Sequence, residues 1–99
     1  MSGYSRGKKM KRAEYKIPGG KLVAVELELV QNELRDIKIY GDFFMHPEES
    51  IKDLESSLNH TNKKEIEQKI NDFFKNKEIN LVGIQPQDFT HVIRLALNN

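Results

Sequence analysis

The sequence has no cysteine and no long apolar run, and both absences limit what the chain can be. Without cysteine among its 99 residues, the chain can form neither a disulfide framework nor a thiolate metal site. No apolar stretch approaches the roughly 18–20 residues needed to cross a bilayer. The basic N-terminus is not followed by the apolar segment of a secretory signal. We therefore expect a soluble cytoplasmic protein.

Apolar residues are also scarce. They make up 37% of the chain against 31% charged residues, which is below and above the respective averages of globular domains. The length allows one domain with a single modest core. This combination predicts a thin core, a well-solvated surface and a face that a partner completes.

The formal net charge of +1 conceals a basic N-terminus and an acidic remainder. Residues 1–16 hold six basic residues against one acidic residue, a net charge of +5, whereas the rest of the chain has ten against fourteen, a net charge of −4. Serines and glycines near the start favour a mobile terminus. We assign residues 1–13 to a basic flexible tail and residues 14–99 to a single domain. A tail that contacts nucleic acid is the alternative, although an acidic body is poorly suited to phosphate backbones.

Two alternating runs in the first half predict an antiparallel β-hairpin. Residues 21–30 place apolar side chains on one face and polar side chains on the other, so one face is expected to be buried and the other wet. Gln31-Asn32 supplies the turn, and residues 34–40 return. Residues 14–17 can add a short edge strand. The side chains expected to point inward are Val23, Val25, Leu27, Leu29, Ile37 and Ile39.

The second half predicts helices. Pro47 suits the first position of a helix that ends near Leu58, with two glutamates in its first turn, where the helix dipole favours anions. Asn62 is a plausible cap for a second helix, and Pro86 starts the last one. The short apolar run 79–84 predicts a further strand.

This order of elements predicts an α+β fold. Strands grouped early and helices grouped later indicate a small antiparallel sheet, made of a β-hairpin plus one or two short strands, with about three helices packed on one face.

No set of side chains in the sequence predicts a self-contained active site. The serines are scattered, and the three histidines lack supporting spacing. Asp42, His46, Glu48 and Glu49 are hard ligands that could hold a metal ion. However, a proline followed by two acids is what a helix start needs, so we assign no metal ligand and no catalytic residue. The sequence indicates a subunit or binding module.

The most distinctive stretch reads Gly-Asp-Phe-Phe-x-x-Pro-Glu-Glu over residues 41–49. It follows Gly-Lys-Leu-Val at residues 20–23 and the hairpin, and it precedes apolar residues at 51, 54 and 58. This pattern resembles the C-terminal domain of lipoate–protein ligases. The resemblance is strongest over residues 16–58 and extends over 59–97 only in the order of the elements.

The resemblance implies a role. Because the chain is only this domain, it is expected to be the separate, non-catalytic accessory subunit of a two-part lipoate–protein ligase, in a heterodimer with the catalytic subunit. In this family the catalytic part binds ATP, Mg²⁺ and lipoate, forms lipoyl-adenylate and transfers the lipoyl group to a lysine of an acceptor domain. The small domain is needed mainly for adenylate formation and moves between the two steps. The chain itself is then expected to bind no cofactor and to meet acceptor domains only indirectly.

The resemblance also implies which residues form a partner interface or activating loop. Lys21 is expected either to face an anionic site of the partner or to be a solvated charge. Asp42 and Glu48 can equally cap the helix, and one of the two adjacent phenylalanines is expected in the core. The full set is Lys21, Gly41, Asp42, Phe43, Phe44, His46, Pro47 and Glu48.

Two other classes of function compete with this interpretation. In a small nucleic-acid-binding α+β protein, the tail would contact phosphates while Tyr40, Phe43 and Phe44 stack on bases. Glu26 and Glu28 on the predicted sheet face oppose that reading, because they would repel phosphates. The other class is a scaffold-type interaction module that has no link to lipoate.

Overall fold

The computed structural model describes residues 10–75 and 77–98. Their fold is α+β, as expected. The elements in chain order are β1 (Lys11–Lys16), β2 (Leu22–Val30), β3 (Glu33–Gly41), β4 (Phe44–His46), α1 (Ser50–Leu58), the 3₁₀ turn η2 (Lys63–Glu65), α2 (Ile66–Lys75), β5 (Asn80–Val82) and α3 (Pro86–Leu97).

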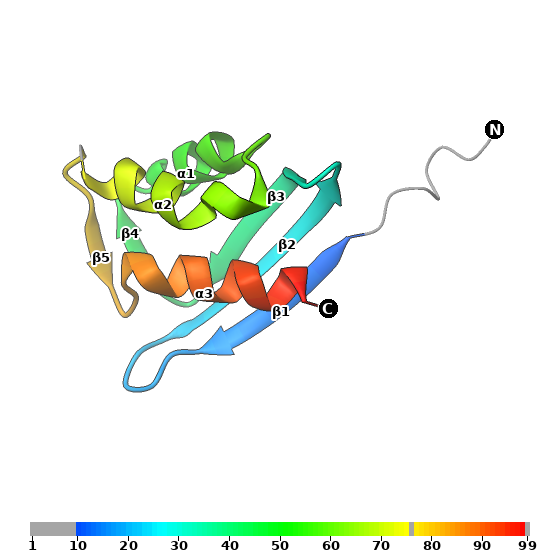
Figure 1. Ribbon diagram of the computed structural model, residues 1–99. Helices are drawn as coiled ribbons and strands as arrows, with labels where there is room; N and C mark the ends of the chain where they lie inside the picture. Colours follow the sequence, from blue (N-terminus) through cyan, green and yellow to red (C-terminus); the bar gives the residue numbers. More distant parts are fainter. Residues whose placement is uncertain (1–9, 76, 99) are drawn as a thin grey trace.

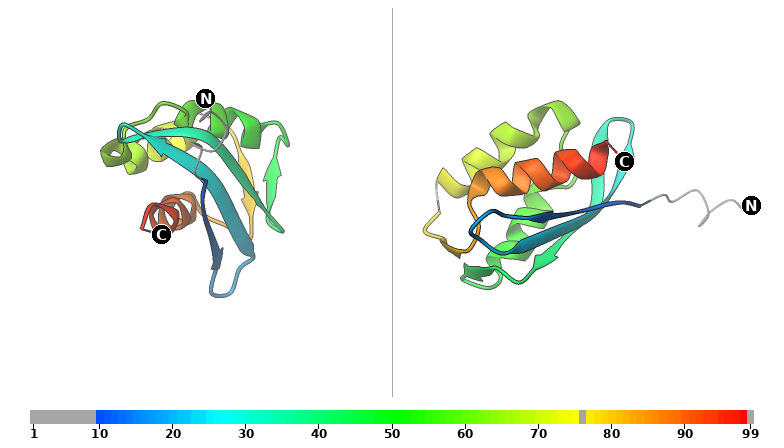
Figure 2. Two further views of the ribbon diagram at one scale, coloured as in Figure 1. Left: turned by 90° about the vertical axis from the view of Figure 1, so that its right-hand side faces the viewer. Right: turned by 90° about the horizontal axis from the view of Figure 1, so that it is seen from below.

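The strands form two antiparallel sheets. β2 lies between β1 and β3 in the larger sheet, and β4 pairs with β5 in a separate small sheet at one end of the molecule (Figure 1). α3 packs on β1 and β2, α1 packs on β3, and α2 lies against both helices. The core is one cluster between the helices and the face of the larger sheet that carries Val23, Val25 and Leu27, which are fully buried. Figure 2 shows α3 lying along this sheet.

The hairpin turn forms where it was predicted. Gln31 and Asn32 have φ values of 53° and 68°, the pair of left-handed conformations that a two-residue hairpin turn requires. Residues that alternate in the sequence therefore pair across β2 and β3 and bury one face.

A β-bulge explains how β3 buries residues that simple alternation separates. Leu34 and Ile37 are three residues apart, so in a regular strand they would face opposite sides. The register between β2 and β3 shifts near Asp36, whose φ is 54°. The extra residue in β3 shifts the inward–outward alternation by one position, so that Leu34, Ile37 and Ile39 all point into the core.

The outer face of the larger sheet differs in part from the wet surface that was expected. Ala24 is only 2% exposed there, because it lies between Glu14 of β1 and Tyr40 of β3. Arg12 Nε donates to the Tyr40 hydroxyl at 3.1 Å, and that hydroxyl donates to Glu26 at 3.1 Å. The hydrogen bonds of Arg12 to Tyr40 and Glu14 raise its pKa above the usual value. This polar network covers the small side chain.

The boundary between the tail and the domain needs correction. β1 begins at Lys11, which pairs with Leu27, so the boundary assigned between residues 13 and 14 falls inside a strand. Ala13 packs against the core and adds burial that favours this extension. Residues 1–9 of the expected tail lie outside the described residues.

The first helix starts later than predicted. Pro47 is not its first residue: α1 begins at Ser50, and Glu48 and Glu49 lie in the turn before it. The N–H of Ser50 donates to the carbonyl of Pro47 at 3.0 Å, and this bond closes the turn. The proline therefore shapes the approach to the helix.

The other two helix starts agree with their predicted signals. Asn62 Oδ1 accepts a hydrogen bond from the N–H of Lys64 at 2.9 Å, and the η2 turn that it caps leads directly into α2. Pro86 is the first residue of α3, and Asp88 accepts from the N–H of Gln85 at 2.8 Å. Among the described helices, none has the length and apolar character needed to cross a membrane.

Candidate functional site

Lys21, Gly41 and Asp42 meet at one end of the larger sheet, around Leu22. The N–H of Leu22 donates to Asp42 Oδ1 at 2.7 Å, and the N–H of Asp42 donates to the carbonyl of Leu22 at 3.2 Å. A Cβ atom on Gly41 would collide with that same carbonyl, so only glycine permits this approach of the two strands. Asp42 therefore ties β3 to the start of β2, and it does not cap α1.

Lys21 joins this junction to the second sheet. Its N–H donates to the carbonyl of Gly83 at 3.0 Å, and its side-chain stem occupies the space where a Cβ on Gly83 would lie. Gly83 has a φ of 85°, which an L-residue rarely adopts. In the described part of the chain, no carboxylate forms an ion pair with the exposed Lys21 ammonium. The backbone of Lys21 is therefore held in place by a hydrogen bond, while its ammonium group is exposed and can interact with an anionic group of another molecule.

The adjacent phenylalanines have opposite environments. Phe43 is 7% exposed and packs edge-on against Phe89, with ring centroids 5.6 Å apart, which confirms that one aromatic belongs to the core. Phe44 is 57% exposed. Its partner across the small sheet is Val82, which is 53% exposed. Together Phe44 and Val82 form an apolar pair on the outer surface of β4 and β5.

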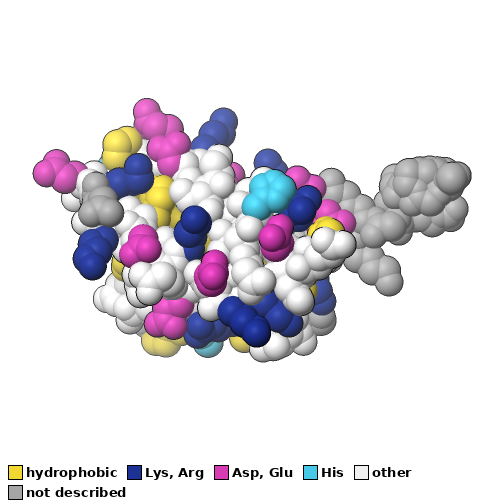
Figure 3. All heavy atoms as spheres, turned by 45° about the horizontal axis from the view of Figure 1, so that its top comes forward, with side chains coloured by type: hydrophobic (Ala, Val, Ile, Leu, Met, Phe, Trp, Pro, Cys, Tyr) yellow, Lys and Arg dark blue, Asp and Glu magenta, His cyan; other side chains and the backbone are white. Residues whose placement is uncertain are grey.

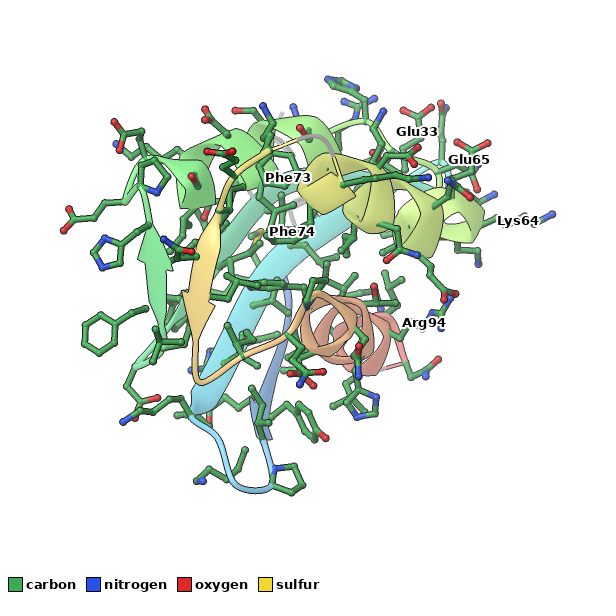
Figure 4. All side chains as sticks on the ribbon, turned by 90° about the vertical axis from the view of Figure 1, so that its left-hand side faces the viewer. Glu33, Lys64, Glu65, Phe73, Phe74 and Arg94 are labelled. Carbon is green, nitrogen blue, oxygen red and sulfur yellow. The ribbon has the colours of Figure 1, made fainter. Side chains whose placement is uncertain are left out.

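Aromatic rings support this small sheet from behind. Phe89 also stacks on Phe74, with centroids 5.7 Å apart and planes at 12°, and Phe74 contacts Phe73 edge-on at 5.2 Å. Figure 4 shows Phe73 and Phe74 extending from α2 on the inner side of β5. Packed aromatic side chains therefore lie on the inner side of the small sheet, and the exposed Phe44–Val82 pair lies on its outer side.

A hollow of about 290 Å³ lies between β4 and the start of α1. His46 and Glu48 are exposed at this hollow, and Pro47 lies in the turn between them. The hollow is lined by Phe43, Phe44, Met45, His46, Glu48 and Ile51. The predicted residues thus fall into two groups: Lys21, Gly41 and Asp42 build the junction, whereas Phe44, His46 and Glu48 border the hollow.

The acidic residues of this region do not gather into a metal site. Within residues 10–75 and 77–98, no group of three or more histidine, aspartate or glutamate side chains is placed to hold a metal ion. The carboxylate of Asp42 instead accepts the backbone hydrogen bond from Leu22.

Val82 and Gly83 are the functional candidates that the sequence analysis missed. The run 79–84 does predict a strand, but neither its pairing with β4 nor the exposure of Val82 can be read from local alternation. The signal that was available is the glycine within this run, at position 83, which indicates a close approach of two backbones.

The arrangement of aromatic residues does not form a base-stacking platform. Such a platform needs Tyr40, Phe43 and Phe44 accessible together, but Phe43 is buried. Basic and acidic side chains are interspersed over most of the face shown in Figure 3.

Comparisons with known proteins agree with this geometry. A curated relative, lipoate-protein ligase A subunit 2 of Thermoplasma acidophilum, is 40% identical over 74 residues, which cover 75% of this chain and 78% of the relative. A chain from the structural analysis of an archaeal lipoylation system, a bi-partite lipoate protein ligase and its E2 lipoyl domain from Thermoplasma acidophilum, matches with a TM-score of 0.80. The identity there is 36%, and the match covers 88% of this chain and 97% of that one. Residues 9–93 match the family described as the bacterial lipoate protein ligase C-terminus, and the chain belongs to this family.

Proposed function

We propose that this protein is the accessory subunit of a two-part lipoate–protein ligase. The observation that carries the proposal is the 40% identity to a protein named as a ligase subunit, together with the match along 97% of a chain from the structural analysis of a bi-partite ligase and its E2 lipoyl domain. Its partner is a separate catalytic subunit, with which it forms a heterodimer. That partner binds ATP, Mg²⁺ and lipoate and modifies lysines of acceptor domains, which this chain meets only indirectly.

The geometry supports a positioning role. The side chain of Asp42 accepts a hydrogen bond from the N–H of Leu22, and the carbonyl of Gly83 accepts one from the N–H of Lys21. These bonds fix the junction at the end of the larger sheet, so docking needs little reordering of this chain. A domain that covers a partner's active site excludes water and fixes mobile loops without supplying a catalytic group. In this proposal Phe44, His46 and Glu48 face the catalytic subunit.

Lys21 faces an anionic group of the partner's site in this proposal. Its backbone is held by Gly83, and its ammonium has no carboxylate partner among the described residues. A cation placed near developing phosphate charge stabilises the adenylate-forming step more than it stabilises the free substrates. The cytoplasmic location expected from the sequence remains a prediction.

Reconstituted lipoylation tests the proposal. The catalytic subunit from the same organism is supplied with ATP, Mg²⁺, lipoate and an acceptor domain, with and without this chain, and the lipoylated product is measured by mass spectrometry. We expect product only when both proteins are present. Equal product without this chain, with a folded and active partner, would contradict the proposal.

A further inference from the structure

Among the residues that the structure describes, the outer edge of β3 in the larger sheet is covered by other parts of the chain, whereas the outer edge of β4 in the small sheet is not. Along β3, the N–H of Ile39 donates to Glu55 at 2.7 Å, that of Asp36 to Asn59 at 3.1 Å, and that of Leu34 to the carbonyl of Thr61 at 2.9 Å. This edge is therefore covered by α1 and the segment that follows it. Natural sheets cover or charge their edges because an open edge pairs with other chains.

The edge of β4 that faces away from β5 is uncovered. Among the described residues, Phe44, Met45 and His46 make no backbone hydrogen bonds outside the ladder with β5. Figure 4 shows β4 at the margin of the molecule, with β5 on one side and no element on the other. β1 is also an edge strand, but it carries Lys11, Arg12, Glu14 and Lys16. β4 carries no lysine, arginine or acid that would oppose pairing.

The surroundings of this edge fit an added strand. Side chains of a strand alternate between the two faces of a sheet, so a segment lying beside β4 presents residues to both. The hollow beside β4 is lined by Phe44 together with Met45 and Ile51, and the exposed Phe44–Val82 pair continues this apolar surface across the outer face of the small sheet. Peptides that extend a sheet gain affinity from backbone hydrogen bonds and specificity from such pockets.

We propose that the catalytic subunit adds an extended segment to the free edge of β4, with one apolar side chain in the hollow and another against Phe44. This inference rests on the proposed function, because it names how that partner binds. A second copy of this chain fits the surface less well. A stable interface buries about 800 Å² per partner, whereas two exposed side chains and a three-residue strand offer only a small part of that area. Such a patch suits an anchor within a larger heteromeric interface.

Hydrogen–deuterium exchange on the full chain tests strand addition directly. The exchange of peptides covering residues 43–47 is compared for the chain alone and for the chain saturated with catalytic subunit. Backbone amides that point away from β5 gain acceptors when a strand pairs with β4, so we expect their exchange to slow by at least about tenfold. Exchange at residues 11–16 of β1 serves as the internal control and should change little.

A matched pair of variants tests the apolar anchor. Phe44→Ala is expected to raise the Kd for the catalytic subunit by roughly 10- to 100-fold, as truncation of a central aromatic does in many interfaces. Tyr40→Ala removes a comparable exposed ring from the outer face of the larger sheet and should change the Kd by less than about threefold. Circular dichroism confirms that both variants are folded.

The outcomes separate this inference from the proposed function. If the complex forms but exchange in β4 is unchanged, or Phe44→Ala binds as tightly as the unaltered chain, strand addition at β4 is wrong and the accessory role stands. If the chain alone forms a dimer that Phe44→Ala disrupts, the occupant is a second copy and the inference is also wrong. If no complex with the catalytic subunit forms, the proposed function itself fails.

Discussion

Gly41 illustrates how a single residue fixes the geometry of the candidate site. Its α-carbon lies so close to the carbonyl of Leu22 that any side chain must push the two strands apart. The next residue, Asp42, then bonds to both backbone groups of Leu22. The site therefore depends on close backbone approach at this junction more than on any reactive group.

Gly41→Ala is expected to lower the free energy of unfolding by about 1–3 kcal/mol, because relieving the collision with Leu22 distorts the end of the sheet. Urea denaturation followed by circular dichroism measures the change. A variant as stable as the unaltered protein would show that the junction tolerates a side chain, and the steric argument would be wrong.

Asp42→Ala tests the hydrogen bond at the same junction. Removing the carboxylate leaves the N–H of Leu22 without its acceptor, and we expect a loss of about 1 kcal/mol in unfolding free energy. Glu48→Ala is the matched control, since Glu48 is an exposed acid of the same segment, and its effect should stay within about 0.5 kcal/mol. Equal effects of the two substitutions would contradict a specific role for Asp42.

At the scale of elements, the covered edge of β3 is the counterpart of the open edge of β4. Glu55 extends from α1 to accept the N–H of Ile39. We expect Glu55→Ala to cost about 1–2 kcal/mol of unfolding free energy, because this half-buried donor loses its acceptor. Lys52→Ala on the exposed side of the same helix should be nearly neutral. Thermal or urea denaturation distinguishes the two, and a neutral Glu55→Ala would mean that water replaces the carboxylate fully.

The elements also show which parts of the fold the sequence predicts. Strong local periodicity identified the hairpin, because its pattern follows one face of each strand, and Pro86 identified the start of α3. β4 was missed. It has only three residues and is stabilised by β5, more than thirty residues away, so no local alternation marks it. The late start of α1 has a similar cause, since Pro47 and the two glutamates fit a turn as well as a first helical turn.

The candidate site was predictable only in part. The resemblance grouped Lys21 with the stretch 41–49 as a partner interface, and that role stays a prediction. The structure brings Lys21 close to Asp42, because the neighbouring Leu22 exchanges hydrogen bonds with Asp42. Phe43, just before β4, is buried and Phe44, in β4, is exposed, and the sequence did not reveal which of the two would be in the core. Val82 belongs to the same surface only through the long-range pairing of the small sheet.

At the scale of the whole molecule, the described residues form one packed core and carry an exposed apolar pair and a free strand edge at one end. The aromatic contacts from Phe43 to Phe73 lie at that end, while the hairpin and all three helices contribute to the rest of the core. In the proposed function, this end contacts the catalytic subunit and stabilises its active conformation.

The most direct test of this account is pyrophosphate release by the catalytic subunit with ATP, Mg²⁺ and lipoate, in the absence of any acceptor domain. We predict that this chain releases no pyrophosphate alone and accelerates release by its partner by at least about tenfold, equivalent to about 1.4 kcal/mol of activation free energy. Phe44→Ala should require a higher concentration for the same stimulation. An unchanged rate with a folded chain and an active partner would contradict the central claim that this subunit promotes adenylate formation.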